Sequence, residues 1–188
     1  MLVEQTDLEG VMLLTPKRFG DARGFFSESW SKKVMAEHGL DYHWVQDNHS
    51  LSRKAGTIRG LHFQAPPHAQ DKLVRCGRGA FFDVVVDARR GSPSYGKWFG
   101  AELSAENGRQ LLVPAGFLHG FATLQPDTEI IYKCSDYYAP ECDGAVHFDS
   151  LGIDWNLQGL EPVLSEKDAA AVPFSDFQSP FVWNGATA

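Results

Sequence analysis

The chain has 188 residues, 43% of them hydrophobic, and 24 acidic against 17 basic side chains give it a net charge of −7. This length supports one well-packed core, and the thirteen Phe and five Trp residues exclude a disordered chain. The acidic balance argues against a broad basic surface for nucleic acid. A few arginines focused in a cleft can still bind an anionic small molecule.

The sequence shows no targeting or membrane segment. No apolar run approaches the ~20 residues that span a bilayer, and the first residues lack the basic and apolar regions of a secretory signal. The three cysteines, Cys76, Cys134 and Cys142, form no close CxxC pair. Reduced thiols are the simplest account, so we expect a cytoplasmic protein with no membrane or nucleic-acid partner.

Short runs of β-branched and aromatic residues, each closed by Gly, Pro, Asn or Asp, dominate the chain and predict strands. In chain order the predicted strands are 11–14, 24–29, 44–50, 57–63, 72–76, 80–86, 98–103, 110–113, 117–124 and 129–137. Two stretches favour helix instead. The first is 31–38, capped by Ser29 or Ser31 and ended by Gly39, and the second is a turn near 165–171 with Ser165 as its cap.

About ten short strands with few helices predict an all-β fold, a sandwich or barrel of the jelly-roll type. Such barrels can leave a ligand cavity between their sheets. The chain contains no internal repeat, low-complexity tract or linker-like stretch before its C-terminal tail. We therefore expect residues 1–188 to form one domain.

The densest polar segment, 57–64, lies within a predicted strand and is soon followed by Lys72. A plain core strand would not need arginine, histidine and glutamine together. Strict alternation would send Arg59 and His62 to opposite faces of the sheet. We hypothesise that Gly60 permits a bulge that re-aims one of them, and a regular strand through Gly60 would contradict this.

A second segment, Pro114 to His119, resembles a signature of cupin barrels, in which a Pro-x-Gly turn leads into a strand whose histidine points into the cavity. Cupins that hold a metal also carry a His-x-His pair with a downstream Glu. The corresponding place here is His62-Phe63-Gln64, and an amide is a poor ligand for zinc or iron. We expect a double-stranded β-helix (cupin) barrel without a metal.

Spaced motifs from about Arg18 to Asp168 are similar, in the same order, to those of one family. The motifs are Gly20-Asp21-x-Arg23-Gly24-Phe25-Phe26-x-Glu28, Val45-Gln46-Asp47-Asn48-His49-Ser50, Arg59-Gly60-Leu61-His62-Phe63-Gln64, Lys72-Leu73-Val74-Arg75, Ser92-Pro93-x-x-Gly96-Lys97-Trp98, Pro114-x-Gly116-Phe117-x-His119-Gly120-Phe121, Tyr132-Lys133 and Leu164-Ser165-Glu166-Lys167-Asp168. Together they resemble the dTDP-4-dehydrorhamnose 3,5-epimerase family. The resemblance implies a cofactor-independent isomerase of dTDP-L-rhamnose biosynthesis, whose substrate is a dTDP-linked 4-keto-6-deoxy sugar.

The resemblance also implies catalytic roles. The C4 ketone acidifies the hydrogens at C3 and C5, so inversion needs a base, an enolate stabiliser and an acid on the opposite face. His62 matches the base, because histidine side chains ordinarily titrate near neutral pH, and Asp168 matches the carboxylate that fixes its tautomer. Lys72 would stand beside the developing enolate oxygen. Tyr132 would return a proton from the other side of the ring.

Further matched positions are expected to bind the nucleotide or the sugar. They comprise Arg23 and Arg59 for the pyrophosphate, Glu28, Gln46 and Asn48 as hydrogen-bonding groups, Phe26 and Tyr138 as stacking faces, His119 with Asp83 as a candidate orienting partner, and also Asp143 and Lys167. A guanidinium suits pyrophosphate because it offers a planar fork of donors. The family is dimeric, and exchange of N-terminal strands implies that each subunit contributes to its neighbour's site.

The sequence departs from the family pattern at a few positions. Phe63 stands where many members have Tyr, and Asp143 stands where Glu is common near the nucleotide, which puts that one contact in doubt. His147 and Phe148 replace the usual Arg-Trp pair. None of these changes touches the expected acid and base.

Plainer interpretations and other functions stay open at this point. His62 alone fits a buried structural histidine, and Arg23 and Arg59 fit ion pairs with Glu28 or Asp47. A 3-only or 5-only epimerase of a related dTDP-4-keto-6-deoxy sugar would keep the same base and tyrosine. A non-catalytic sugar-nucleotide-binding cupin would bind without exchanging protons, and a cupin oxygenase would need a metal.

Overall fold

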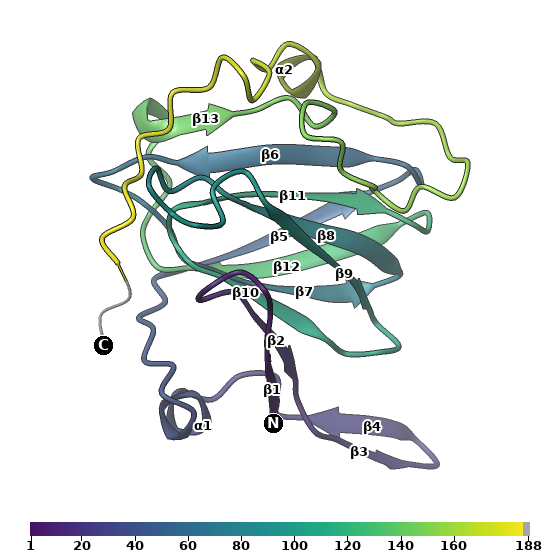
Figure 1. The fold of residues 1–188 in the computed structure, drawn as a ribbon. Coiled ribbons are helices and arrows are strands. Elements are labelled where there is room, and N and C mark those ends of the chain that lie inside the picture. Colours follow the sequence, from purple (N-terminus) through teal and green to yellow (C-terminus); the bar gives the residue numbers. More distant parts are fainter. Residues whose placement is uncertain (186–188) are drawn as a thin grey trace.

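The computed structural model describes residues 1–185 and consists of two antiparallel sheets packed face to face (Figure 1). One sheet has the order β1 (Leu2–Gln5), β2 (Met12–Thr15), β10 (Gln110–Val113), β7 (Lys72–Arg78), β12 (Thr128–Cys134) and β5 (Gln46–Ser52). The other has the order β13 (Asp143–Ala145), β6 (Ile58–Gln64), β11 (Phe117–Thr123), β8 (Ala80–Asp87) and β9 (Trp98–Ser104). The predicted all-β class is confirmed.

Two short α-helices, a 3-10 turn and a hairpin are the remaining regular elements of the described chain. They are α1 (Lys32–Glu37), capped by Ser31, α2 (Glu166–Ala169), capped by Ser165, a 3-10 turn at Pro140–Cys142, and the paired strands β3 (Arg18–Asp21) and β4 (Gly24–Ser27). Both helices therefore begin after serines singled out in the sequence. No helix within residues 1–185 combines the length and apolar character needed to cross a bilayer.

The predicted strands are all present, with their ends displaced by a few residues, but β1, β3 and β13 were not predicted. β1 and β3 are short and mostly exposed, so they carry no run of buried apolar residues. β13 has the sequence Asp-Gly-Ala, which is typical of a turn. It is held as a strand only by its pairing with β6, which no local pattern predicts.

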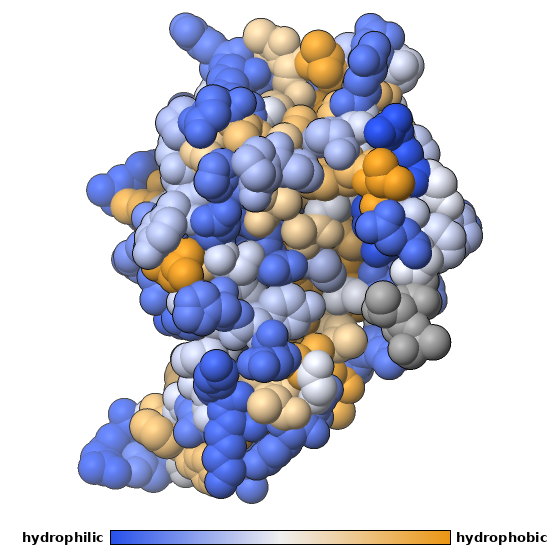
Figure 2. All heavy atoms as spheres, turned by 90° about the vertical axis from the view of Figure 1, so that its left-hand side faces the viewer, coloured by the Kyte–Doolittle hydropathy of each residue, from blue (hydrophilic) through white to orange (hydrophobic). Residues whose placement is uncertain are grey.

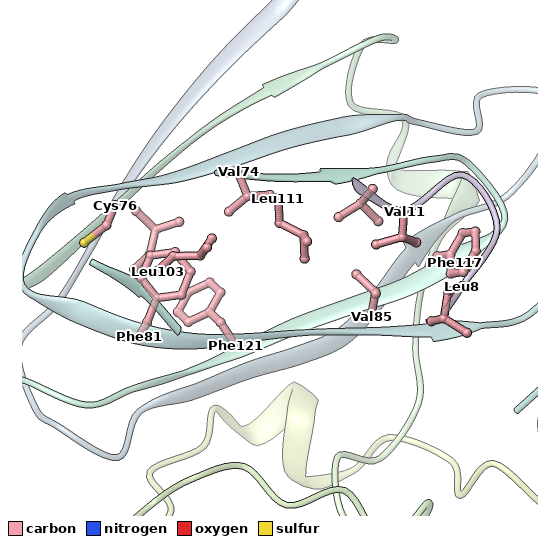
Figure 3. Packing of buried hydrophobic residues seen from close by; sticks show 12 residues of the cluster. Leu8, Val11, Val74, Cys76, Phe81, Val85, Leu103, Leu111, Phe117 and Phe121 are labelled. Carbon is pink, nitrogen blue, oxygen red and sulfur yellow. The ribbon is translucent and has the colours of Figure 1, made fainter. Parts of the chain in front are cut away.

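The main core lies between the two sheets, where side chains from both inner faces interdigitate (Figure 3). β8 contributes Phe81 and Val85, β11 contributes Phe117 and Phe121, and the opposite sheet contributes Val74 among others. Phe81 and Phe121 pack with their ring centroids 5.4 Å apart. This core fills one end of the sandwich and leaves room for polar side chains at the other.

The outer face of the five-stranded sheet is buried as well, because the C-terminal part of the chain runs across it. Phe181 and Trp155 belong to this second apolar layer, and Phe63 packs against Phe177 and Phe181. The backbone of the segment is fastened to the loop after β8, where the Arg90 amide donates to the Phe181 carbonyl. Every residue of β11 is consequently buried, and β6 is held from behind.

The β3–β4 hairpin and α1 lie apart from the barrel, below it in Figure 1. Phe25 and Phe26 of the hairpin are strongly exposed, 59% and 70% respectively. Figure 2 shows the side of the molecule where β6 ends and β7 begins. That side is mostly hydrophilic, with hydrophobic residues scattered across it.

Candidate active site

A bulge in β6 brings Arg59 and His62 to the same face of the sheet. His62 lies opposite His119 of β11, and Arg59 lies opposite Phe121, so two residues of β6 face the single Gly120. One extra residue reverses the alternation beyond it. The bulge hypothesised from Gly60 is confirmed, and both side chains point to the inner face, where Arg59 reaches across to Ser52 and the Leu51 carbonyl of β5.

Glycine is required at this bulge because two backbones touch. Gly60 has a φ of 129°, and a Cβ placed on it would lie 2.5 Å from the Gly120 Cα and 2.8 Å from the His119 carbonyl oxygen. A Cβ on Gly120 would in turn lie 2.9 Å from the Arg59 carbonyl oxygen. Neither position has room for a side chain, so the bulge is fixed by this pair of glycines.

His62 and Asp168 form a close pair between β6 and α2. His62 Nε2 lies 2.5 Å from Asp168 Oδ1, and the Ser165 hydroxyl donates to Asp168 Oδ2 over 2.7 Å. Burial acts to raise the pKa of Asp168, but the hydrogen bonds from His62 and Ser165 outweigh it and hold that pKa below its usual range. The carboxylate therefore accepts the Nε2 hydrogen, which leaves Nδ1 of the neutral imidazole as a free base.

His62 lines a cleft of about 430 Å³ at the open end of the sandwich. The other lining residues come from both sheets, from α2 and from the loops before β7 and after β12, and they are Gln46, Asn48, Phe63, Gln64, Gln70, Lys72, Tyr132, Tyr138, Asp143 and Lys167. The cleft thus gathers three of the four predicted catalytic residues, His62, Lys72 and Tyr132, and the fourth, Asp168, contacts it through His62. Phe63, Gln64 and Gln70 were not predicted to line it, although Gln70 lies only two positions before Lys72.

The ammonium and the phenol of the cleft are both affected by burial. Burial lowers the pKa of Lys72, while the negatively charged forms of nearby groups act in the opposite direction. Burial raises the pKa of Tyr132. At neutral pH the phenol therefore keeps its proton and can act as an acid.

The predicted nucleotide-binding residues from β5 and the 138–143 region form one hydrogen-bonded group at the rim. The Gln46 side chain donates to Asn48 Oδ1 over 3.0 Å and accepts from the Tyr138 amide over 3.2 Å. The Tyr138 hydroxyl lies 3.4 Å from Asp143, which also pairs with Lys167. The Tyr138 side chain itself is exposed.

His119 lies in the wall of the barrel rather than on the cleft surface. It is 8% exposed, and its Nε2 lies 2.7 Å from Oδ1 of the fully buried Asp83. The candidate orienting partner is therefore in contact with it. Because His119 stands opposite His62 in register, the histidines of two His–Asp pairs lie side by side on β6 and β11.

The structure does not bring Arg23, Phe26 and Glu28 to this cleft within one chain. Arg23 lies at the tip of the β3–β4 hairpin and pairs with Asp21, and Phe26 is on the same exposed hairpin. The alternative ion pair between Arg23 and Glu28 is therefore wrong. Asp47 pairs with Lys133 and does not pair with Arg59.

Gln64 stands at the position where metal-binding cupins have a ligand, but its side chain binds backbone groups. Its Nε2 donates to the carbonyls of His68 and Tyr137, and its Oε1 accepts from the Ala139 amide. The side chain thus anchors the backbone on both sides of Tyr138. In the described part of the chain no three His, Cys, Asp or Glu side chains gather as metal ligands.

The family model and the curated relatives that match this chain carry the same description. A family model described as dTDP-4-dehydrorhamnose 3,5-epimerase matches residues 5–176. The chain is 52% identical over 172 residues to a dTDP-4-dehydrorhamnose 3,5-epimerase of Sinorhizobium fredii, covering 90% of this chain and 88% of the relative.

Solved structures agree in fold. An enzyme of the same description from Bacillus anthracis, with TDP and PPi bound, is 48% identical and superimposes with a TM-score of 0.88 over 92% of this chain and 98% of its own. A dTDP-6-deoxy-D-glucose-3,5-epimerase from Legionella pneumophila, in complex with dTDP-4-keto-L-rhamnose, is 41% identical with a TM-score of 0.92 over 98% and 99% of the two chains.

The contact of Gly60 with Gly120 predicts that Gly60→Ala destabilises the protein by about 3 kcal/mol or more, because the new Cβ adds a backbone clash to a disfavoured φ. Chemical denaturation of the purified variant measures this cost.

Gly24→Ala is the matched control, because Gly24 has a similar φ of 134° and no atom within 4 Å of its virtual Cβ. We expect it to cost about 2 kcal/mol or less. Equal costs for the two variants would show that the strand contact is unimportant.

Proposed function

The chain belongs to the dTDP-4-dehydrorhamnose 3,5-epimerase family, and we propose that it converts dTDP-4-dehydro-6-deoxy-D-glucose to dTDP-4-dehydro-L-rhamnose without a cofactor. As a member of this family it is a carbohydrate epimerase. The observation that supports the reaction best is the His62–Asp168 pair, 2.5 Å apart, at a cleft that also contains an ammonium and a phenol.

In the proposed first step His62 removes a hydrogen from carbon. Asp168 holds the Nε2 hydrogen, so Nδ1 is the nitrogen that accepts the proton, and the carboxylate then stabilises the imidazolium that forms. The electron pair of the broken C–H bond moves to the C4 oxygen of the sugar as an enolate. The same cycle at C3 and at C5 accounts for two inversions.

Lys72 stabilises this enolate by its positive charge. An ammonium in a closed cleft acts more strongly on a developing oxyanion than it would in water. Lys72 is half-buried in the wall of the cleft, and it shares that cleft with His62. The sugar ketone is therefore proposed to lie between these two side chains.

Tyr132 is the proposed acid that returns a proton from the opposite face of the ring. It comes from β12, in the sheet that faces β6 across the sandwich, so a sugar between the sheets has His62 on one side and Tyr132 on the other. Burial raises the pKa of Tyr132, which keeps the phenol protonated until the enolate takes its hydrogen.

The nucleotide is proposed to bind at the rim, where Gln46, Asn48, Asp143 and Lys167 offer polar contacts and Tyr138 offers a stacking face. The hairpin residues Arg23 and Phe26, together with Glu28 just after the hairpin, are proposed to complete this site in a homodimer, each hairpin reaching the cleft of its partner. Two observations support the dimer: the hairpin projects from its own barrel, and two of its phenylalanines are strongly exposed.

We also propose that residues 1–188 form a single domain, that the protein is cytoplasmic and that it holds no metal. The alternatives differ in measurable ways. A 3-only or 5-only epimerase would exchange one carbon-bound hydrogen with solvent, a binding protein would exchange none, and an oxygenase would depend on a metal.

Incubation of the protein with dTDP-4-dehydro-6-deoxy-D-glucose in deuterated water tests the reaction. We expect NMR and mass spectrometry to find deuterium at both C3 and C5, because both hydrogens pass through a solvent-exchangeable base. His62→Ala should reduce this exchange by about 10³-fold or more, while dTDP affinity measured by calorimetry changes only a few fold.

His38→Ala is the control for that variant, since His38 caps α1 and lies outside the cleft. It should exchange both hydrogens at the wild-type rate. Substantial exchange by His62→Ala would remove His62 from its role.

Tyr132→Phe should separate exchange from inversion. Because His62 still removes the hydrogen, we expect deuterium to enter the recovered substrate while the formation of inverted product slows by about 10²-fold or more. Product and substrate are quantified in one NMR time course. Equal loss of exchange and inversion would argue against an acid on the opposite face.

Mixing two inactive variants tests whether a site is shared between subunits. If Arg23→Ala loses activity through the partner's site, a heterodimer of Arg23→Ala with His62→Ala contains one site with both residues intact. Random exchange of subunits would then restore about a quarter of wild-type activity. Activity that stays at background after verified subunit exchange would place Arg23 and His62 in the same chain's site.

A further inference from the structure

Asp168 is a buried carboxylate whose orientation a single hydrogen bond does not fix. Its exposure is 4%, and its Oδ1 lies 2.5 Å from His62 Nε2. The torsion that turns the plane of an aspartate carboxylate has broad minima, so a bond at Oδ1 alone leaves the plane free to rotate. A second anchor on Oδ2 is required to hold Oδ1 toward the imidazole.

Ser165 supplies this second anchor. Its Oγ lies 2.7 Å from Asp168 Oδ2 and 3.1 Å from the backbone nitrogen of the same residue. A backbone amide can only donate, and an ionised carboxylate can only accept. The single hydrogen of the hydroxyl is therefore directed at Oδ2, while the oxygen accepts from the amide as the N-cap of α2.

Ser165 also lies beside an anchor to β6, the strand that carries His62. Two positions earlier, the Val163 amide donates to the Gly56 carbonyl over 2.9 Å, and the Val163 carbonyl accepts from the Ile58 amide over 3.0 Å. The helix that follows has only four residues, too few to be stable by itself. The bonds of Ser165 therefore connect a segment fixed on β6 to the helical turn that presents the carboxylate.

The other α-helix shows that capping alone does not require this arrangement. Ser31 caps α1 in the same way, because its Oγ accepts from the amide three residues later. The residue at that position is Val34, whose side chain cannot receive the serine hydrogen. Of the two α-helices within residues 1–185, only α2 has a capping hydroxyl that also meets a carboxylate.

The position of Ser165 limits how it can act on the reaction. It is not among the residues that line the cleft with Lys72 and Tyr132. It lies instead with His62 and Asp168 at a second hollow of about 270 Å³. Any effect of this hydroxyl on chemistry in the cleft must therefore pass through the carboxylate.

We propose that Ser165 is a positioning residue whose hydroxyl holds the Asp168 carboxylate in the orientation that His62 needs as a base. The inference rests on the proposed function, in which His62 removes a hydrogen from carbon. With both carboxylate oxygens engaged, the Nε2 hydrogen stays on its acceptor and the ring stays in place. Loss of the hydroxyl frees Oδ2, so the base is correctly oriented for a smaller fraction of the time.

Deuterium exchange into the sugar by Ser165→Ala tests the proposal. We expect kcat for exchange to fall about fivefold or more while KM stays within about twofold, because the base is misoriented and the nucleotide contacts remain. Ser165→Thr keeps the hydroxyl, and the exposed position has room for its methyl group, so it should retain about half of the wild-type kcat or more. A kcat in Ser165→Ala equal to that of wild type would overturn the proposal.

The same substitution in an Asp168→Ala background separates positioning from a general effect on α2. Without the carboxylate the hydroxyl has nothing to orient, so Ser165→Ala should lower the residual exchange rate of Asp168→Ala by less than about twofold. Excess enzyme and long incubation make this slow exchange measurable. A fall by the same factor in both backgrounds would show that the serine only maintains the helix, against the proposal.

Ser31→Ala is the matched control, because it removes the corresponding cap from α1. It should lower the melting temperature and leave kcat for exchange unchanged, since no carboxylate depends on its hydroxyl. If Ser31→Ala lowered kcat as much as Ser165→Ala does, the loss would belong to capping and the proposal would be wrong.

A carbon NMR titration of the Asp168 carboxyl, assigned by the signal missing from Asp168→Asn, needs no turnover. Burial acts to raise the pKa of Asp168, but hydrogen bonds from His62 and Ser165 hold it below its usual range. This pKa should therefore move upward in Ser165→Ala and stay unchanged in Ser31→Ala. An unchanged pKa in Ser165→Ala would contradict the proposal. If wild type exchanges no deuterium, the proposed function fails, while this titration still decides whether the hydroxyl acts on the carboxylate.

Discussion

The direct contact between the backbones of β6 and β11 is the constraint on which the site depends. At Gly60 and Gly120 the two strands approach so closely that neither can carry a side chain. The extra residue that this contact accommodates turns Arg59 and His62 toward the same interior. Without it, regular alternation would direct one of them into the apolar layer beneath the C-terminal segment.

The second theme of the structure is charge held away from water. The cleft and its walls combine an ammonium, a phenol and two His–Asp pairs within a sandwich whose other half is a dense apolar core. Low polarizability of the surroundings strengthens each charge interaction and penalises each unbalanced charge. The site is therefore a set of mutually dependent groups, and the removal of one member changes the protonation of others.

Much of the fold and most of the cleft could be predicted from the sequence. The strands with apolar runs, the serine caps and the bulge at Gly60 follow from local rules, and the motif resemblance brought in Lys72, Tyr132 and Asp168. β13 could not be predicted, because its pairing with β6 joins residues distant in sequence. The separation of Arg23 and Phe26 from the cleft is a matter of where the hairpin points, which no local pattern encodes. The full burial of Asp83 could not be predicted either, because it depends on how the two sheets pack.

The bonding of Gln64 limits how this barrel can change its chemistry. A histidine at that position would restore the pair of imidazoles on which metal-dependent cupins rely. Yet the amide already holds the carbonyl of Tyr137 and the amide of Ala139, so the same exchange would release the loop that carries Tyr138. The substitution that adds a metal ligand would thus at the same time free the loop that carries Tyr138, the residue proposed to stack on the nucleotide.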